Sequence, residues 1–258
     1  MEHLPSLFVS HGAPTYALEP GLAGAQLNAL GRVLPQPKAV LVVSPHWMTR
    51  EAQVTGGIRP RTIHDFGGFP RPLHEFQYPA PGAPELAARV QALLAPLPVA
   101  ADTQWGLDHG TWSVLCHVFP DADVPVVQLS MDETQPAAFH YEIGRRIAPL
   151  RDEGVLVIGS GNLVHNLHAY AWGRHPAAPF DWALRFEERA RELITASDHA
   201  PLVAYETLGR DALLSAPTPD HYLPLLYVLG ARHEDDVASF PVAGIDGGSV
   251  SMMSVALA

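Results

Sequence analysis

The sequence reads VLVIGS over Val155–Ser160, an apolar run that does not alternate between apolar and polar residues. Comparable runs occur at Ser6–Ser10 (SLFVS), Ala39–Ser44 (AVLVVS) and Val124–Ser130 (VPVVQLS). Strands of this composition are buried on both faces, which is typical of a largely parallel sheet covered by helices on each side. The four runs therefore predict the central strands of such a sheet.

Helical stretches separate these strand runs. Pro84–Leu94 and Pro136–Leu150 open with proline, which suits the first position of a helix, and Asp181–Thr195 has one charged and one apolar face. A shorter helix is expected to start at Thr218, as its cap, and to end at Gly230. The C-terminal run GSVSMMSVALA resembles a further strand. Alternating strands and helices predict an α/β fold with three layers, α/β/α, around a mostly parallel central sheet.

The composition limits the classes of function. The chain has 258 residues, is 47% hydrophobic and carries a net charge of −11, which disfavours duplex DNA and anionic membranes as partners. A single cysteine, Cys116, excludes an intrachain disulfide and a zinc site built from several cysteines. With no linker-like tract, basic leader or long apolar run, we expect residues 1–258 to form one cytoplasmic domain. We expect a monomer or small homo-oligomer that binds a small molecule, and neither nucleic acid nor a membrane.

One long segment, residues 56–84, lacks both helical and strand periodicity. It is dense in glycine, proline, phenylalanine and histidine, and includes Phe66, Phe69, Phe76 and Tyr78. Irregular segments of this length inside a compact fold are usually functional loops or disordered. Its aromatic side chains indicate that the loop is ordered and covers a functional site.

Histidines follow the predicted strands. His11 comes directly after the first strand, His46 follows the second, and His165 follows the turn after the last of the four runs. His221 lies at the start of the expected short helix. Ligands bind at the carboxyl ends of strands in open parallel sheets, so we expect these rings to converge there. Neutral imidazole is the commonest protein ligand for zinc, copper and iron, which makes the group a candidate metal site.

The remaining histidines carry weaker signals. His109 lies in a tight loop and is either an acid/base group or a turn residue, while His64 and His74 lie in the irregular loop. We set aside the following histidines as surface or helix-face residues: His3, His117, His140, His168, His175, His199 and His233. The sequence contains no HExxH helix, no G-x-S-x-G elbow and no phosphate-binding glycine loop.

Seven segments together resemble the DOPA-dioxygenase family, a branch of the class III extradiol ring-cleavage dioxygenases that includes the bacterial 4,5-DOPA extradiol dioxygenase. The resemblance runs in the same order along nearly the whole chain. The segments are His11–Pro14 (HGAP), Ser44–Trp47 (SPHW), Ile63–Pro70 (IHDFGGFP), Tyr78–Gly82 (YPAPG), Trp105–Gly110 (WGLDHG), Gly159–Asn166 (GSGNLVHN) and Pro217–Leu226 (PTPDHYLPLL).

The resemblance implies one divalent metal ion per chain, bound by His11, His46 and His221. His165 either joins these ligands or stands beside the metal as an acid/base group, and His109 matches a pocket histidine that contacts substrate or oxygen. The implied reaction is extradiol cleavage of a catechol such as L-DOPA, with both atoms of O2 incorporated.

The implied ligand set differs from that of the wider extradiol class, which uses two histidines and a carboxylate. An all-histidine set suits zinc at least as well as Fe(II), so both metals stay open. Asp65, Asp108 and Asp220 are expected to orient neighbouring histidines. Two alternative functions also stay open, a zinc-dependent hydrolase and a non-catalytic binding protein of the same fold. In a further alternative, the histidines serve structural roles alone.

Overall fold

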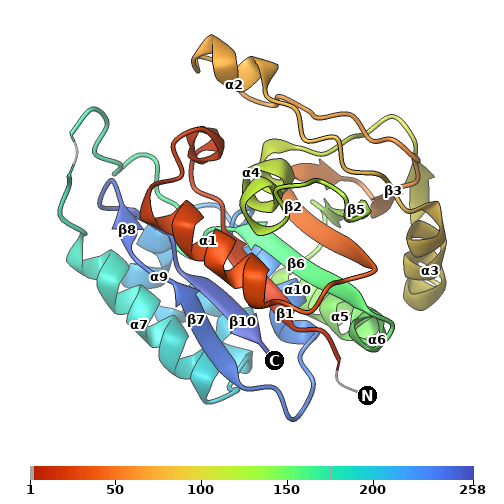
Figure 1. Ribbon diagram of the computed structural model, residues 1–258. Coiled ribbons are helices and arrows are strands. Elements are labelled where there is room, and N and C mark those ends of the chain that lie inside the picture. Colours follow the sequence, from red (N-terminus) through yellow and green to blue (C-terminus); the bar gives the residue numbers. More distant parts are fainter. Residues whose placement is uncertain (1–2, 175) are drawn as a thin grey trace.

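The fold is built on an eight-stranded sheet, seen in a computed structural model that describes residues 3–174 and 176–258 (Figure 1). The strands lie in the order β4 (Ala100–Asp102), β3 (Gln53–Thr55), β5 (Val126–Asp132), β2 (Ala39–Thr49), β6 (Val155–Gly161), β1 (Ser6–Ser10), β10 (Ser254–Leu257) and β7 (Ala238–Val242). The four strands in the middle, from β5 to β1, run parallel to one another. β10 is antiparallel to both its neighbours, and β3 is antiparallel to β5.

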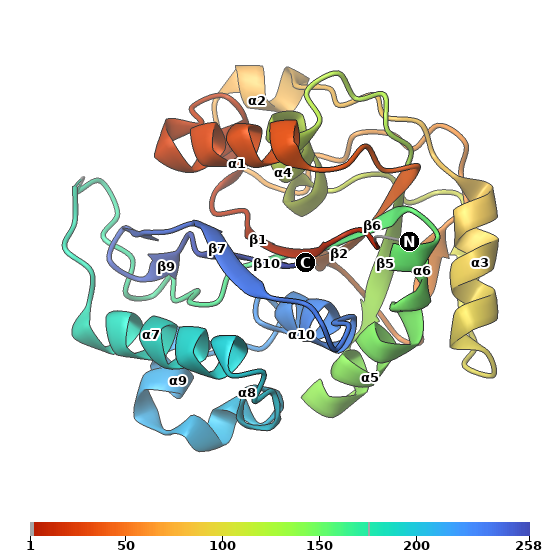
Figure 2. The ribbon, with the colours of Figure 1, turned by 60° about the horizontal axis from the view of Figure 1, so that its bottom comes forward.

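Helices cover both faces of the sheet, which gives three layers (Figure 2). In β1, Leu7 and Val9 face the helices α1 (Gly21–Val33) and α4 (His109–Val118), whereas Phe8 packs in the core on the opposite face. Both faces of the central strands are therefore apolar, because each is buried under helices. The opposite layer contains α3 (Pro84–Leu94), α5 (Ala137–Ile147), α7 (Asp181–Thr195) and α10 (Leu223–Gly230).

Short elements complete the chain. They are two 3-10 turns, η1 (Pro14–Ala17) and η2 (Tyr205–Leu208), the short helices α2 (Arg71–Glu75), α6 (Pro149–Asp152), α8 (Ala200–Val203) and α9 (Arg210–Ser215), and a small hairpin of β8 (Ile245–Asp246) and β9 (Val250–Ser251). Within the part of the chain that the structure describes, no helix is both long and apolar enough to span a membrane.

The predicted α/β fold with a mostly parallel sheet is confirmed, with local corrections. The helix expected over Pro136–Leu150 breaks into α5 and α6 at Pro149, which has no N–H to donate. The helix expected from Thr218 begins later, at Leu223, and Thr218 is not its cap. The carbonyl of Pro219 accepts hydrogen bonds from the next turn instead, so His221 lies in a turn that precedes α10.

Candidate metal centre and active site

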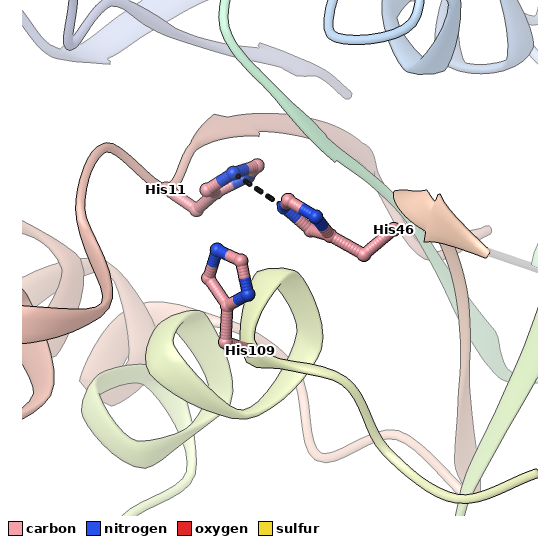
Figure 3. A group of neighbouring side chains, drawn as sticks. All are labelled: His11, His46 and His109. Carbon is pink, nitrogen blue, oxygen red and sulfur yellow. Dashed lines mark hydrogen bonds between the residues drawn. The ribbon is translucent and has the colours of Figure 1, made fainter. Parts of the chain in front are cut away.

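Five histidines meet at the carboxyl ends of the parallel strands. His11 follows β1, His46 lies near the end of β2, His165 follows β6, and His109 and His221 come from the start of α4 and the turn before α10. All five line one cavity. Figure 3 shows the rings of His11, His46 and His109 turned toward a common space.

Local backbone features place two of these rings. In β2 the pairing with β5 is regular up to Val43 and shifts before Met48, so the strand is irregular where it carries His46. At the end of β6, a Cβ on Gly161 would lie 2.3 Å from the carbonyl oxygen of His221, so only glycine lets this turn approach the strand. The same carbonyl accepts a hydrogen bond from the backbone N–H of Asn162 at 2.9 Å, which fixes His221 against the sheet.

Three of the rings are almost equally spaced. The ring centres lie 5.1 Å apart for His11 and His46, 5.2 Å for His11 and His221, and 5.3 Å for His46 and His221. The Nε2 atoms of His11 and His46 are 3.2 Å apart (Figure 3). Imidazoles bound at about 2.0–2.1 Å to one tetrahedral ion would have ring centres about 5 Å apart and nitrogens about 3.3 Å apart. The ring centres of these three histidines therefore have the spacing of three ligands of one metal ion, whereas the ligand nitrogens that lie within 4.8 Å of one another are those of His11, His46 and His109.

The other two rings lie too close to a neighbour for that geometry. The ring of His109 is 3.8 Å from that of His46, although its ligand nitrogen lies within 4.8 Å of those of His11 and His46. The ring of His165 stacks on His221 at 3.6 Å, with only 7° between the planes. Each of these ring distances is more than about 1 Å shorter than the spacing of about 5 Å that two ligands of one ion would show.

On three of these rings, hydrogen bonds at Nδ1 leave the lone pair of Nε2 available. The Ser160 hydroxyl donates to the carbonyl of Gly110 at 2.5 Å, so it accepts from Nδ1–H of His11 at 3.0 Å. Nδ1–H of His221 donates to the carboxylate of Asp220, and Nδ1–H of His109 donates to Asp65 at 2.8 Å. Carboxylates or hydroxyls that hold the outer nitrogen in this way are typical of metal-binding histidines.

Burial keeps the imidazoles of His11, His46 and His165 neutral. Burial first, and then the charges of His46 and His221, hold the pKa of His11 well below its usual value. Burial and the neighbouring His109 lower the pKa of His46 in the same way, against the opposing effect of Asp65. For His165, burial and His221 lower the pKa to about 3. Neutral rings with free lone pairs are the form that binds a cation.

Asp108 differs from the expectation that it would orient a histidine. No hydrogen bond joins its side chain to a histidine in the part of the chain that the structure describes. The carboxylate, completely buried, accepts hydrogen bonds from Ser44 at 2.8 Å, from Gln128 at 2.7 Å and from the backbone N–H of Thr111 at 3.1 Å. It caps α4 and ties the start of that helix to β2 and β5, which positions His109 through the backbone.

The cavity above the rings has a volume of about 250 Å³. Phe66 and Phe69 of the irregular loop form one part of its wall, and Tyr170, Trp172 and Asp246 form another. The Tyr170 hydroxyl donates to Asp246 at 2.6 Å. The volume lies just below the range of about 300–1,000 Å³ usual for small-molecule sites, so the cavity admits a single-ring compound.

Comparisons with known proteins agree with this geometry. Residues 3–245 match the family described as the catalytic LigB subunit of aromatic ring-opening dioxygenase. The chain belongs to this family. It is 49% identical over 256 residues to a 4,5-DOPA dioxygenase extradiol of Escherichia coli (strain K12), covering 98% of this chain and 94% of that protein. A protein of the same name from Beta vulgaris is 38% identical over 252 residues, covering 95% and 93%.

A solved structure supports the assignment of this ring-opening dioxygenase. The crystal structure of an uncharacterized protein from Escherichia coli K12 superimposes with a TM-score of 0.84 at 43% identity and covers 99% of this chain and 100% of that one. The enzyme is therefore a dioxygenase with the expected fold, and its family implies a metal cofactor. The neutral histidines at the end of the cavity could bind that metal.

The structure brings together every histidine that the sequence singled out for the dioxygenase site: His11, His46, His109, His165 and His221. Ser160 was not predicted from the sequence, because nothing in a buried strand reveals which hydroxyl faces a ring. Tyr170, Trp172 and Asp246 were not predicted either, because they belong to no recognisable motif. Among the histidines set aside, His140 is completely buried in α5, and His175 lies outside the described residues.

Proposed function

We propose that this dioxygenase opens the ring of a catechol such as L-DOPA beside its two hydroxyls, with both atoms of O2 incorporated. The observation that carries the proposal is the nearly equal spacing of His11, His46 and His221 at the end of a cavity of single-ring size. The names of the similar proteins from Escherichia coli and Beta vulgaris support 4,5-cleavage of DOPA.

His11, His46 and His221 are the proposed metal ligands, each through Nε2. A divalent ion held there, zinc or Fe(II), would supply Lewis acidity and bring the catechol oxygens and O2 together. A donor set of three imidazoles suits both metals and leaves coordination positions open. Ser160 and Asp220 keep two of the rings in the required tautomer through their Nδ1 atoms.

His109 is the proposed proton acceptor. Its Nδ1–H donates to Asp65, so Nε2 holds the lone pair that would take a proton from a catechol hydroxyl. The carboxylate of Asp65 would then stabilise the positive charge of the ring. The ring of His109 lies 3.8 Å from that of His46, so a substrate oxygen next to the metal ligands would be within its reach.

His165 is the second proposed catalytic residue, and its proposed role differs from that of His109. The ring is stacked on His221 and forms part of the cavity wall. The sequence left His165 open as a ligand or an acid/base group, and the second role requires a ring that titrates near neutral pH, but burial holds its pKa near 3 and keeps the ring neutral. A neutral imidazole can donate one N–H to an oxygen that gains negative charge during ring opening, and this is the role we assign to it.

The loop over residues 56–84 supplies two of the aromatic side chains that line the cavity. The ring of Phe66 meets His109 edge to face at 5.7 Å and packs against Phe69 at 5.3 Å. Such side chains would contact the face or edge of a bound catechol ring and exclude water from it. The loop would thus protect a reactive ring-opened intermediate from side reactions.

Reconstitution of the metal-free protein tests the function. Protein prepared anaerobically with Fe(II), and in parallel with zinc, is given L-DOPA and then O2. We expect a yellow ring-opened product and the uptake of one O2 per substrate in at least one preparation, since both oxygen atoms enter the product. If neither preparation consumes O2 with any catechol, the proposal is wrong.

The same measurement separates the alternatives. A zinc-dependent hydrolase would be indifferent to oxygen and would use a carboxylate base beside the metal. Asp65 and Asp220 instead accept hydrogen bonds from the outer nitrogens of the histidines, which does not favour that function. A non-catalytic binding protein would bind a catechol without consuming O2. We further propose that residues 1–258 form one domain and act in the cytoplasm as a monomer or small homo-oligomer.

A further inference from the structure

A second cluster of metal-ligating side chains lies away from the cavity. His3 precedes β1, Asp152 is the last residue of α6, and His233 follows α10. One ring nitrogen of each histidine and a carboxylate oxygen of Asp152 lie within 4.8 Å of one another. β1 runs from this end of the sheet to His11, so the cluster and the cavity lie at opposite ends of the same strand. We propose that His3, Asp152 and His233 bind a second divalent cation, of the zinc class.

His3 is held in the manner of a metal-binding histidine. Its Nε2–H donates to Oδ1 of Asp236 at 2.8 Å, which leaves Nδ1 with the lone pair. Arg151 donates two hydrogen bonds to the same carboxylate, at 2.6 and 2.8 Å. The side chains of Arg151 and Asp236 are both completely buried. A carboxylate fixed in this way orients the imidazole, as the outer partners of zinc-bound histidines do.

His233 presents an unsatisfied nitrogen to the cluster. Its backbone N–H donates to Asp236 at 2.8 Å, and its ring centre lies 4.4 Å from that of His3. Nε2 is shielded from solvent and has no hydrogen-bond partner within the described residues. The nearest carboxylate oxygen, on Asp152, is 3.6 Å away, too far for a hydrogen bond. Buried polar atoms are normally paired, and a cation between the two would satisfy both.

The donor set selects the class of ion. Two imidazole nitrogens and one carboxylate oxygen match the ligands that zinc takes in proteins. Magnesium and calcium prefer oxygen ligands and would bind weakly to a site with two histidines. The side chain of Asp152 is exposed, so the site opens to solvent on that side and water can complete the coordination.

A cation at this site would join three separate parts of the chain. His3 lies just before β1, Asp152 ends α6, and His233 belongs to the connection between α10 and β7. Binding would hold the start of β1 against the two other segments. Because the three ligands come together only in the folded protein, the cation would bind the folded state alone. A ligand that binds only the folded state raises the thermal midpoint in proportion to the logarithm of its concentration.

Zinc stoichiometry of the full-length protein tests the proposal. The metal-free protein is equilibrated with zinc alone, and bound metal per chain is measured. We expect His233→Ala and Asp152→Asn each to bind one zinc ion fewer per chain than the unaltered protein. Asp152 is exposed, so its substitution removes a ligand without disturbing the core. The control His168→Ala, at an exposed histidine outside the cluster, should retain the full stoichiometry.

Two further readouts separate this site from the cavity. Zinc should raise the thermal midpoint of His11→Ala protein more than that of the His11→Ala/His233→Ala double variant. Dioxygenase activity of His233→Ala should equal that of the unaltered enzyme, because the cluster lies at the other end of the sheet. Equal zinc stoichiometry in the unaltered protein, His233→Ala and Asp152→Asn would overturn the proposal whatever reaction the cavity catalyses.

Discussion

Asp65 holds His109 by both its backbone and its ring. Oδ1 accepts the backbone N–H of His109 at 2.9 Å, and Oδ2 accepts Nδ1–H of its ring at 2.8 Å. The same Oδ2 lies 3.5 Å from Nδ1 of His46. Burial opposes ionisation of Asp65, but the hydrogen bonds from the ring and the backbone N–H of His109 hold its pKa below the usual value, so it is a carboxylate. A residue of the irregular loop thereby sets the orientation of a histidine on α4.

We therefore expect Asp65→Ala to lower kcat by about 10- to 100-fold, the usual cost of losing a partner that orients a histidine. The loss removes the group that fixes the tautomer of His109, whereas Nε2 atoms of the proposed ligands keep their positions. Steady-state kinetics and metal content of the same preparation check this. A matched loop substitution, Glu75→Ala, removes an exposed carboxylate that forms an ion pair with Arg71 and should leave kcat unchanged. Unchanged kcat in Asp65→Ala would contradict the positioning role.

The ring spacings also predict which single substitutions release the metal. His11→Ala, His46→Ala and His221→Ala should each lose the metal ion of the cavity and activity together, because each removes one of its three ligands. His109→Ala should keep that metal and lower kcat by roughly 10² to 10⁴, the usual range for an acid/base group. His165→Ala should also keep the metal and lower kcat by roughly 10² to 10³, the usual cost of losing one hydrogen-bond donor to a developing negative charge. Metal content and the kinetics of O2 uptake, measured on the same preparation of each variant, distinguish ligands from the other two histidines. Complete loss of metal in His109→Ala would reassign that residue as a ligand in place of His221.

Part of this fold was predictable because its local signals agree with its tertiary contacts. The runs at Ser6–Ser10, Pro84–Leu94 and Asp181–Thr195 form elements with the expected bounds. The start of α10 was not predictable in this way. Thr218 and Pro219 have the composition of a helix start, yet their segment folds as a turn against Gly161. Tertiary packing at the end of β6 overrides the local preference there.

The candidate site was predictable where strand ends bring histidines together, and less so for their partners. The rule that ligands bind at the carboxyl ends of parallel strands was enough to expect His11 and His46 in one place. It could not show that Ser160 is hydrogen-bonded to His11, or that Asp108 caps a helix instead of orienting a ring. Those contacts depend on side-chain direction and distance, which a single sequence does not encode locally.

Gly110 is expected to be irreplaceable because of its closeness to His46. A Cβ at this position would lie 2.5 Å from Oγ of Ser44 and 2.9 Å from Cδ2 of His46, so the ring would have to move. Gly110→Ala should therefore lower kcat by about 10²-fold, the effect of a displacement of about 1 Å in a catalytic site. In the control Gly57→Ala, the nearest atom would be an oxygen at an ordinary 3.8 Å. Equal kinetics of the two variants would show that His46 tolerates the shift.

The Arg151–Asp236 pair should be a major determinant of stability. Both side chains are completely buried, and Arg151 also donates to the carbonyls of Leu4, Ala231 and Leu257. Arg151→Met would leave a buried carboxylate without its cation, which costs about 3–5 kcal/mol of unfolding free energy. Urea denaturation with a metal chelator present measures this. Arg145→Met, which breaks an exposed pair with Glu142, should change the free energy by less than about 0.5 kcal/mol.

Acid should remove the contribution of Asp236 to stability. Burial alone would raise the pKa of this carboxyl, but the hydrogen bonds from Arg151 and from the backbone of His233 hold it below the usual value. A carboxyl whose pKa is lower in the folded state stabilises the fold above its unfolded pKa, about 3.9, and this stabilisation disappears as the pH falls through the folded value. The difference in urea midpoint between the unaltered protein and Asp236→Asn should therefore be constant from pH 7 to about pH 5 and shrink below about pH 4. A difference that stays constant down to pH 3 would mean that Asp236 titrates alike in both states.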